Sequence, residues 1–478
     1  MDSSTPRTAT SFWSVIFAIF FGNFLASLST TTINIALPDF MQEFSSQLQT
    51  VQWMVTGFML ATGIIAPVLG FLGDQLSYKR VYLISLSGFT ICSALCLAAW
   101  NIESLIFFRV MQGLFSGLIM PATMTIIYQV IGKEKQAFAL SLWSVAAMLG
   151  PAIGPTLGGL LVQYFNWHAL FLINLPIGVI AILVAVRRIP YYKLSKKQSF
   201  DVVGFVTVIG CSTSLLVAFS EGSTWGWGSM KTVTLLIVGS LMLALFIGWE
   251  LKVKEPLLHL RVFRIRRFTY SIVLQAIISI SLYSGTFLVP IFLQTVLGVS
   301  PMQAGLVMLP GSLMMVICAP ISGRLYTRIG PVWLCMVGVI LMFVATLMLS
   351  NLTVSTTRYY IAFWMAFRYV GIAFANLTVT NSGMSAVPTE ETGHASSINN
   401  WIKQGMGSFA IGIFSSILAS RTAAHLQAAG KVTAMVKEKA FTWGIDDVFV
   451  VATVIVAVAI PMSFLLRRKK TATAASAA

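Results

Sequence analysis

The chain has 478 residues, of which 57% are apolar and only 10% are charged, and its mean hydropathy is +0.85. A soluble domain carries about 25% charged residues, so this composition excludes a soluble protein and requires lipid as the solvent for most of the surface. The formal net charge is +16. Its Lys and Arg residues are spread over many short loops rather than gathered in one domain, which argues against nucleic-acid binding.

The N-terminal segment 1–11 is short and polar, and the apolar stretch after it is too long for the hydrophobic part of a signal peptide. We therefore expect that stretch to be retained as a membrane span. Apolar stretches of sufficient length predict an all-α integral membrane protein with fourteen transmembrane helices. The expected spans are residues 12–36, 50–72, 81–100, 104–130, 137–163, 168–187, 201–220, 232–250, 269–293, 302–322, 331–350, 358–380, 395–419 and 447–466.

The basic side chains predict the orientation of these spans. With the N-terminus in the cytoplasm, most of the 31 Lys and Arg residues fall in cytoplasmic loops or in the C-terminal tail. This asymmetry predicts that both termini are cytoplasmic, and it explains the net charge through membrane topology. The basic residues expected outside are Lys231, Arg358, Arg421, Lys431, Lys437 and Lys439.

Several spans carry polar or large aromatic side chains that could line a substrate pathway. The first span has a run of hydroxyl and amide groups that offers hydrogen bonds without charge, and the thirteenth has amides that are costly to leave unpaired in lipid. For the aromatic residues, packing against the core or against lipid is an alternative. The candidate cavity residues are Ser29, Thr32, Asn34, Trp53, Trp143, Arg368, Asn399, Asn400, Lys403 and Gln404.

Charged loops of similar composition follow the second and the tenth span. The first loop, 70–80, holds Asp74 near Lys79 and Arg80, where a charge contact between neighbouring helices is natural, and its glycines permit a tight turn. The second loop, 323–330, repeats this pattern more weakly. An ordinary charged loop would explain either copy alone, but repetition at matching positions predicts an internal duplication with two similar helix bundles.

The segment 136–163 contains an unusual run at 150–159, Gly-Pro-Ala-Ile-Gly-Pro-Thr-Leu-Gly-Gly. A soluble helix rejects internal Pro and repeated Gly, whereas neighbouring membrane helices can re-satisfy the freed backbone groups. Gly at a spacing of four also makes a smooth groove for a second helix. A simple helix–helix contact is the alternative, but the doubled Gly-Pro pair favours a bent, close-packed helix that acts as a seal.

Three basic residues fall within spans, namely Arg109, Arg368 and Lys403. A charged side chain in a span is costly and usually faces a cavity or a partner. Because a guanidinium stays protonated, Arg109 would act by shifting the pKa of a nearby acid or by organising water. The structural alternative for Arg109 is hydrogen bonding to backbone carbonyl groups. For Arg368 and Lys403, cavity lining and structural pairing are both open.

The order and content of these motifs resemble those of the fourteen-span drug:proton antiporter family of the major facilitator superfamily, the EmrB/QacA type. The resemblance covers essentially the whole chain, and the segments that carry it are 70–80, 109–113, 150–159, 166–178 and 388–407. It implies a major facilitator fold, in which two six-helix bundles surround a central cavity and two extra helices are inserted between the bundles.

The resemblance also implies a domain division and the roles of several residues. Residues 1–187 would form the N-terminal bundle, 188–268 the inserted two-helix segment with its linkers, and 269–478 the C-terminal bundle with a cytoplasmic tail. Arg109 would take part in proton coupling. The gating residues would be Gly150, Pro151, Gly154, Pro155 and Gly158.

One departure from the family pattern bears on mechanism. The family's first span usually reads Leu-Asp-x-Thr, and this chain has Ser29 where the acid is expected. No other Asp or Glu falls clearly at mid-membrane, so proton coupling would use a peripheral acid, such as Glu103 or Asp74, or another ion would replace the proton. A cavity with basic groups and no acid should favour neutral, zwitterionic or anionic amphiphiles over cations.

These features predict a secondary active multidrug exporter of the bacterial cytoplasmic membrane, which moves small amphipathic compounds outward by alternating access in exchange for protons. The alternative is a dedicated exporter of one metabolite, antibiotic or lipid, with atypical or no proton coupling. A membrane enzyme is disfavoured because paired carboxylates in the membrane, a histidine cluster and a nucleotide loop are missing, and a scaffold would leave the antiporter-type run without a purpose. We expect a monomer in a lipid bilayer, with no cofactor, no metal site and five structural thiols.

Overall fold

The computed structural model describes residues 12–131, 133–191, 200–388, 391–429 and 433–466. Over these residues the chain is helical and has no strand. The α-helices are α1 (Phe12–Ile35), α2 (Leu37–Glu43), α3 (Leu48–Val51), α4 (Trp53–Ile65), α5 (Leu69–Leu76), α6 (Tyr78–Leu97), α7 (Ile102–Val130), α8 (Lys133–Phe165), α9 (Ala169–Leu172), α10 (Asn174–Arg188), α11 (Val202–Trp225), α12 (Met230–Glu250), α13 (Arg266–Thr295), α14 (Pro301–Ile329), α15 (Pro331–Met348), α16 (Arg358–Met384), α17 (Thr392–Ala429) and α18 (Ala434–Met462). Short 3-10 helices are η1 (Ala66–Val68), η2 (Leu260–Arg264) and η4 (Ser463–Leu466).

The length and composition of the helices confirm an all-α membrane protein. Among the described residues, thirteen helical segments are long and apolar enough to cross a membrane. The helix α8, of 33 residues, is not one of these thirteen, and several of its side chains lie outside the described residues. It packs against α1 and α14 at the place expected for the fifth span. The total of fourteen spans therefore stays a prediction.

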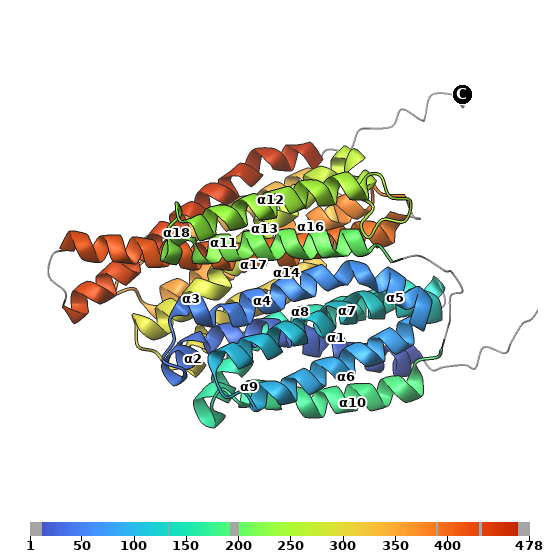
Figure 1. Cartoon of the computed structure of the whole chain (residues 1–478), viewed down its shortest axis with the longest axis horizontal. Coiled ribbons are helices and arrows are strands. Elements are labelled where there is room, and N and C mark those ends of the chain that lie inside the picture. The colour runs from blue at the N-terminus through green and yellow to red at the C-terminus, as the bar shows by residue number, and fades with distance from the viewer. Residues whose placement is uncertain (1–11, 132, 192–199, 389–390, 430–432, 467–478) are drawn as a thin grey trace, which may run out of the picture.

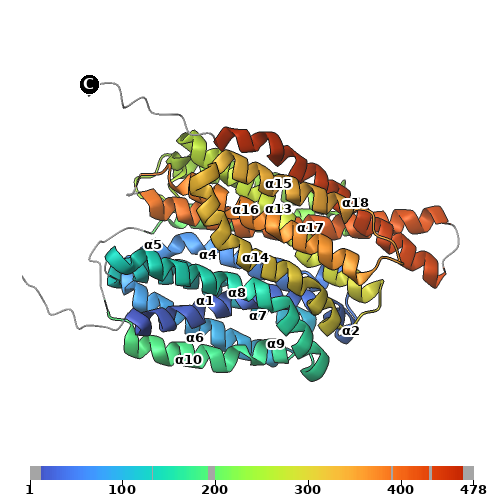
Figure 2. The same ribbon diagram turned by 180° about the vertical axis from the view of Figure 1, so that it is seen from behind.

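The long helices form two groups that lie side by side (Figure 1; Figure 2). One group contains α1, α4, α6, α7, α8 and α10, and the other contains α13 to α18. Helices α11 and α12 pack on each other, and α11 also contacts α17 of the second group. The most extensive contacts between the two groups are those of α8 with α14 and of α4 with α17.

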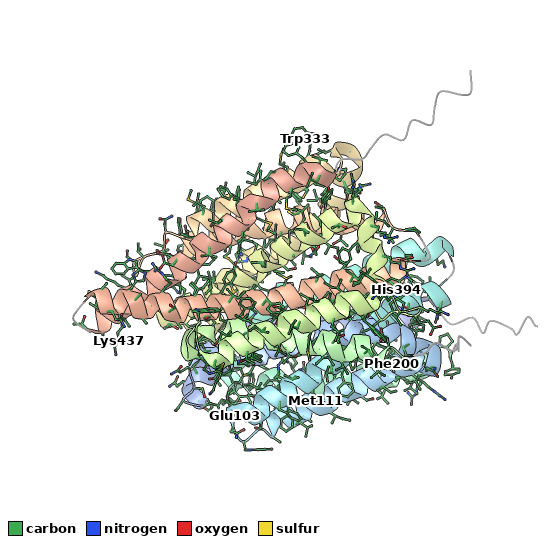
Figure 3. All side chains as sticks on the ribbon, turned by 45° about the horizontal axis from the view of Figure 1, so that its top comes forward. Glu103, Met111, Phe200, Trp333, His394 and Lys437 are labelled. Carbon is green, nitrogen blue, oxygen red and sulfur yellow. The ribbon has the colours of Figure 1, made fainter. Side chains whose placement is uncertain are left out.

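The two ends of the bundle differ in charge. At one end, α1 and α8 begin and Phe71 packs on Phe200, with ring centroids 5.0 Å apart. We call this the basic end because these side chains gather there: Lys79, Arg80, Lys135, Arg187 and Arg188. Figure 3 shows His394 at the basic end and Glu103 and Lys437 toward the opposite end. That the basic end faces the cytoplasm stays a prediction.

The turn after the second expected span differs from the prediction. That span is divided into α3, α4, η1 and α5, and α5 continues to Leu76 instead of ending at a glycine. The chain turns at Ser77, whose φ of 82° is left-handed, and Ser77 Oγ accepts a hydrogen bond from the Arg80 backbone N–H at 3.4 Å. Gly330, with φ 85°, makes the matching turn between α14 and α15. Gly73 provides space instead of a turn, because a Cβ there would lie 2.4 Å from the Tyr78 ring.

The segment 421–446, which lies between the thirteenth and fourteenth expected spans, is mostly helical in the described residues. Helix α17 continues to Ala429 and α18 begins at Ala434, so the two helices form a hairpin that extends past the other helices (Figure 1; Figure 2). Asp447 of α18 holds the hairpin together: its Oδ2 accepts from Arg421 Nε at 2.6 Å and contacts His425 Nε2 at 2.8 Å. Polar contacts of this kind let a helix continue beyond its apolar stretch.

Candidate functional site

Arg109 is fully buried in the first group of helices. Helix α7 begins at a capping box formed by Asn101 and Ser104, which places Arg109 about two turns into the helix. Arg109 Nη1 donates to Ser29 Oγ at 2.9 Å, and Nη2 donates to the Ser29 carbonyl O at 3.2 Å. Arg109 Nε donates to the Met54 carbonyl O of α4 at 3.3 Å. The guanidinium thus joins α7 to α1 and α4.

The hydrogen bonds of Arg109 continue into two more helices. Arg109 Nη1 also donates to Gln112 Oε1, and Gln112 Nε2 donates to Ser93 Oγ of α6. Asn174 Nδ2, in the first turn of α10, donates to the same Ser93 oxygen at 3.4 Å. We call Ser29, Ser93, Arg109, Gln112 and Asn174 the Arg109 network. All five are buried, and they tie together α1, α6, α7 and α10.

Three members of this network, Ser93, Gln112 and Asn174, were not among the residues predicted to form a site. One sequence signal could have found Gln112, because it lies three residues after Arg109 and therefore on the same face of the helix. Asn174 lies in the segment 166–178 that carries the family resemblance, but no local pattern predicts its contact or that of Ser93, because both contacts are made between helices.

Neutral groups surround the Arg109 charge. The ring of Phe58 lies 4.1 Å from the guanidinium carbon, which is the geometry of a cation–π contact. Among the described residues no carboxylate forms an ion pair with Arg109. Glu103 is exposed in the first turn of α7 and does not meet Arg109. The side chain of Asp74 lies outside the described residues. Hydrogen bonds to backbone and hydroxyl oxygens, the structural alternative for Arg109, are what the structure shows.

Arg368 has a parallel environment in the second group. It is 1% exposed on α16, and its Nη2 donates to Ser284 Oγ at 2.7 Å and to Ser281 Oγ at 3.3 Å, both on α13. Its Nε is buried without a partner. Gly285 makes room for the guanidinium, because a Cβ at that position would lie 1.6 Å from Arg368 Nη1. In both groups, therefore, an arginine on the fourth long helix bonds to a serine on the first.

The glycine run of α8 lies against α1. A Cβ at Gly150 would be 2.5 Å from the Leu28 backbone N, and one at Gly158 would be 2.8 Å from the Thr32 carbonyl O. A Cβ at Gly154 would be 2.2 Å from Thr31 Oγ1. The glycines at this four-residue spacing therefore allow the backbones of α8 and α1 to approach closely, as the sequence pattern indicated. Despite its two prolines, α8 is one continuous helix.

The other side of the same run faces α14, across the boundary between the two groups. A Cβ at Gly159 would lie 2.2 Å from the Pro301 carbonyl O, and a Cβ at Gly305 would lie 2.5 Å from the Pro155 carbonyl O. Thr156 Oγ1 donates to the Gly305 carbonyl O at 3.0 Å. We call this contact the α8–α14 seam. The side chain of Pro151 lies outside the described residues.

The predicted cavity residues are distributed over several contacts. Trp53 Nε1 donates to Glu221 of α11 at 3.1 Å, and Trp143 Nε1 donates to Thr123 Oγ1 at 3.0 Å. Thr32 packs on α8. Asn34 is 3% exposed, and neither its amide N nor its amide O has a partner.

The remaining predicted cavity residues lie on α17. Gln404 packs on Gly63 of α4, where an added Cβ would lie 3.2 Å from Gln404 Cβ, and the buried Oε1 of Gln404 has no partner. Asn399, Asn400 and Lys403 are half-buried on the same helix. The structure therefore brings α17 against α4, but it does not show the predicted residues as the lining of one pocket.

A cavity of about 510 Å³ lies at the opposite end, where the sequence did not predict a site. It lies between the segment after α1 and the segment after α8, and its lining residues are Asp39, Gln42, Glu43, Val162, Asn166 and Trp167. Burial raises the pKa of Asp39 to about 6, against a smaller lowering by a backbone hydrogen bond. Asp39 Oδ2 is buried and has no partner.

Comparison with known proteins identifies the family. The model of the Major Facilitator Superfamily matches residues 19–411 of this chain. The tetracenomycin C resistance and export protein of Streptomyces glaucescens is 30% identical over 410 residues, which cover 86% of this chain and 76% of that protein. The colistin resistance protein EmrB of Acinetobacter baumannii is 30% identical over 424 residues, covering 87% and 81%.

A solved structure has the same fold. The bacterial homologue of the human lysosomal transporter Spinster, in an inward-facing and occupied conformation, matches with a TM-score of 0.64. The match covers 95% of this chain and 96% of that chain at 15% sequence identity, so it supports the fold alone. On the family match and the thirteen apolar helices, the chain belongs to the Major Facilitator Superfamily and is a multi-pass membrane transporter rather than an enzyme.

Proposed function

We propose that this transporter exports small amphipathic compounds across the bacterial cytoplasmic membrane, by alternating access and in exchange for protons. Relatives named for resistance to tetracenomycin C, lincomycin and colistin support export of such compounds. The proposal includes a cytoplasmic basic end and a division into residues 1–187, 188–268 and 269–478, with the chain acting as a monomer.

The α8–α14 seam is the observation that carries alternating access. Its closest contacts are made by glycines against backbone carbonyl oxygens and by the short side chain of Thr156, so the two helices can slide with little repacking of large side chains. Because α8 also packs closely on α1, a movement at the seam reaches the helix that bears Ser29. This placement supports the proposal that Gly154, Pro155 and Gly158 take part in gating.

In this proposal Arg109 positions helices and does not bind substrate. All three of its guanidinium nitrogens already donate hydrogen bonds within the Arg109 network or to Met54. Lys403 differs from Arg109 in burial, because it is only half-buried on α17. Like Arg109, it forms no ion pair in the described part of the chain. We propose that Lys403, with Asn399 and Gln404 nearby, favours neutral or anionic amphiphiles over cations.

The test is substrate movement in proteoliposomes under an imposed pH gradient, with a panel of neutral, anionic and cationic amphiphiles. Proton antiport predicts that the gradient accelerates export and that export of substrate moves protons in the opposite direction. A collapsed gradient serves as the control for leak. Movement of none of the panel, or rates that do not change with the gradient, would contradict the proposal.

The second candidate is a dedicated exporter of one compound without proton coupling, and Ser29 is the observation that favours it. Ser29 occupies the position at which a carboxylate would pair with Arg109. A serine hydroxyl does not bind and release a proton near neutral pH, so it cannot replace that carboxylate in proton coupling. Gradient-independent transport of a single compound from the panel would favour this candidate over multidrug antiport.

A further inference from the structure

The hairpin of α11 and α12 carries two buried carboxylates at the basic end that the proposed transport cycle does not use. Asp201 is the N-cap residue of α11 and is 9% exposed, and Glu250 is the last residue of α12 and is 2% exposed. The two helices pack on each other along the hairpin, so the start of α11 lies beside the end of α12.

Each carboxylate has one oxygen that is bonded and one that is not. Asp201 Oδ1 accepts from the Gly204 backbone N–H and from Trp249 Nε1, both at 2.8 Å, and Glu250 Oε2 accepts from the Leu258 backbone N–H at 3.1 Å. Asp201 Oδ2 and Glu250 Oε1 are buried without a partner. Both free oxygens point to the same place, because a Cβ at Gly204 would lie 2.5 Å from each of them.

No basic group neutralises this pair in the described part of the chain. Asp201 is the charged group that faces Glu250. The charged groups on the neighbouring elements make other contacts or are exposed. Arg261 donates to the Leu251 carbonyl O, His259 contacts Glu391 and stacks on His394, and Arg267 Nε donates to Ser382 Oγ. The exposed groups are Lys252, Lys254, Glu255, Arg264 and Arg266, and none of the four basic ones forms an ion pair in the described residues. Because both free oxygens lie 2.5 Å from the same point, they are within about 5 Å of each other, and two buried anions this close are strongly disfavoured unless a cation or a proton lies between them.

We propose that Asp201 and Glu250 form a proton-binding site in which one proton, taken from water, is shared between Asp201 Oδ2 and Glu250 Oε1. The helix ends decide which residue holds the proton. Asp201 lies at the N-terminus of α11 and accepts two N–H groups, which stabilise the carboxylate, whereas Glu250 lies at the C-terminus of α12, where the helix dipole disfavours negative charge. Glu250 is therefore the protonated donor and Asp201 the acceptor.

The site holds the connector that leads from α12 to α13. Leu258, whose N–H bonds to Glu250, is fully buried in a cluster that includes Phe268 of α13 and Ile398 of α17. Loss of the shared proton would leave two repelling anions at the base of this connector and loosen its attachment. A role of this site in proton antiport rests on the function proposed above. In that role, the site would supply the buried acid that α1 lacks.

The direct test is infrared difference spectroscopy of the purified full-length protein at neutral pH, because a protonated carboxyl has a carbonyl stretch that a carboxylate lacks. We expect a component of the wild-type protonated-carboxyl band to be lost in Glu250→Gln and retained in Glu438→Gln, which changes an exposed acid on α18. Equal signals in the wild type and in Glu250→Gln would overturn the proposal.

Two further measurements cover the case of a variant that folds poorly. Gly204→Ala keeps both acids but inserts a methyl group between the oxygens, so it should also lose the signal.

In thermal unfolding, the wild type should lose stability as rising pH removes the shared proton, whereas Glu250→Gln, whose amide can still donate to Asp201, should lose less. Stabilisation of the wild type by sodium over choline, absent in Glu250→Gln, would assign the site to a metal cation and overturn the proton. None of these measurements involves transport, so the export proposal fails or stands separately.

Discussion

Ser29 Oγ lies 2.9 Å from Arg109 Nη1, where a longer side chain ending in a carboxylate would form an ion pair. The second group has the same relationship, because Ser284 Oγ lies 2.7 Å from Arg368 Nη2. Both buried guanidinium groups thus bond to a hydroxyl on the first long helix of their own group. In the described residues, therefore, neutral hydrogen-bond acceptors and not an acid surround the Arg109 charge.

An acid at position 29, where the family pattern has one, should change the coupling of transport to protons. We expect Ser29→Asp to form a buried ion pair with Arg109, to increase the dependence of transport on a pH gradient, and to increase the rate for cationic amphiphiles. Transport of the charged panel in proteoliposomes measures both effects. Ser29→Ala, which removes only the hydroxyl, is the matched control and should gain neither property. Identical gradient dependence in Ser29→Asp and wild type would show that this position does not control coupling.

Stability and transport should require the planar guanidinium of Arg109, with its several N–H donors, as well as its positive charge. Arg109→Lys keeps the charge but cannot reach Ser29, Gln112 and Met54 together, and each lost charge-assisted hydrogen bond is worth about 1.5–3 kcal/mol. We expect a lower unfolding temperature and transport reduced by roughly tenfold or more. Arg187→Lys, an exposed change at the end of α10, should leave both unchanged. Wild-type transport by Arg109→Lys would mean that charge alone suffices.

The α8–α14 seam should not tolerate a side chain at Gly159. In Gly159→Ala the Cβ would lie 2.2 Å from the Pro301 carbonyl O, and the backbone must separate to accept it, at a cost of about 1–3 kcal/mol. We expect slower transport and a longer distance between spin labels on α8 and α14. Gly248→Ala is the control, because nothing lies within 4 Å of its Cβ, and it should be neutral or stabilising by up to about 1 kcal/mol. Unchanged label distances in Gly159→Ala would argue against a tight seam.

Asp39 should make stability depend on pH. Because its pKa in the folded protein is raised to about 6, the folded state holds this proton more tightly than the unfolded state. The resulting stabilisation is fully present below about pH 4, the ordinary range for Asp, and is lost as the pH rises through about 6. Asp39→Asn should remove this decline, so thermal unfolding of the variant and the wild type should diverge between pH 4 and 7. Parallel curves over this range would contradict a raised pKa.

Length and hydropathy by themselves determined that this is an all-α membrane protein, because each span is a local stretch of apolar residues whose length must match the bilayer. The glycine run at 150–159 also predicted a close helix contact correctly, since small residues at a spacing of four lie on one face whatever the partner is. The sequence did not indicate that both α1 and α14 are the partners.

The tertiary structure decided the contacts that join residues far apart in the chain. Hydropathy does not show which face of a span meets which neighbour, so the links from Arg109 through Gln112 to Ser93, and the meeting of Asp201 with Glu250, follow only from packing. The same reason explains the continuation of α17 to Ala429, because polar contacts between helices stabilise a segment that is not apolar enough to predict.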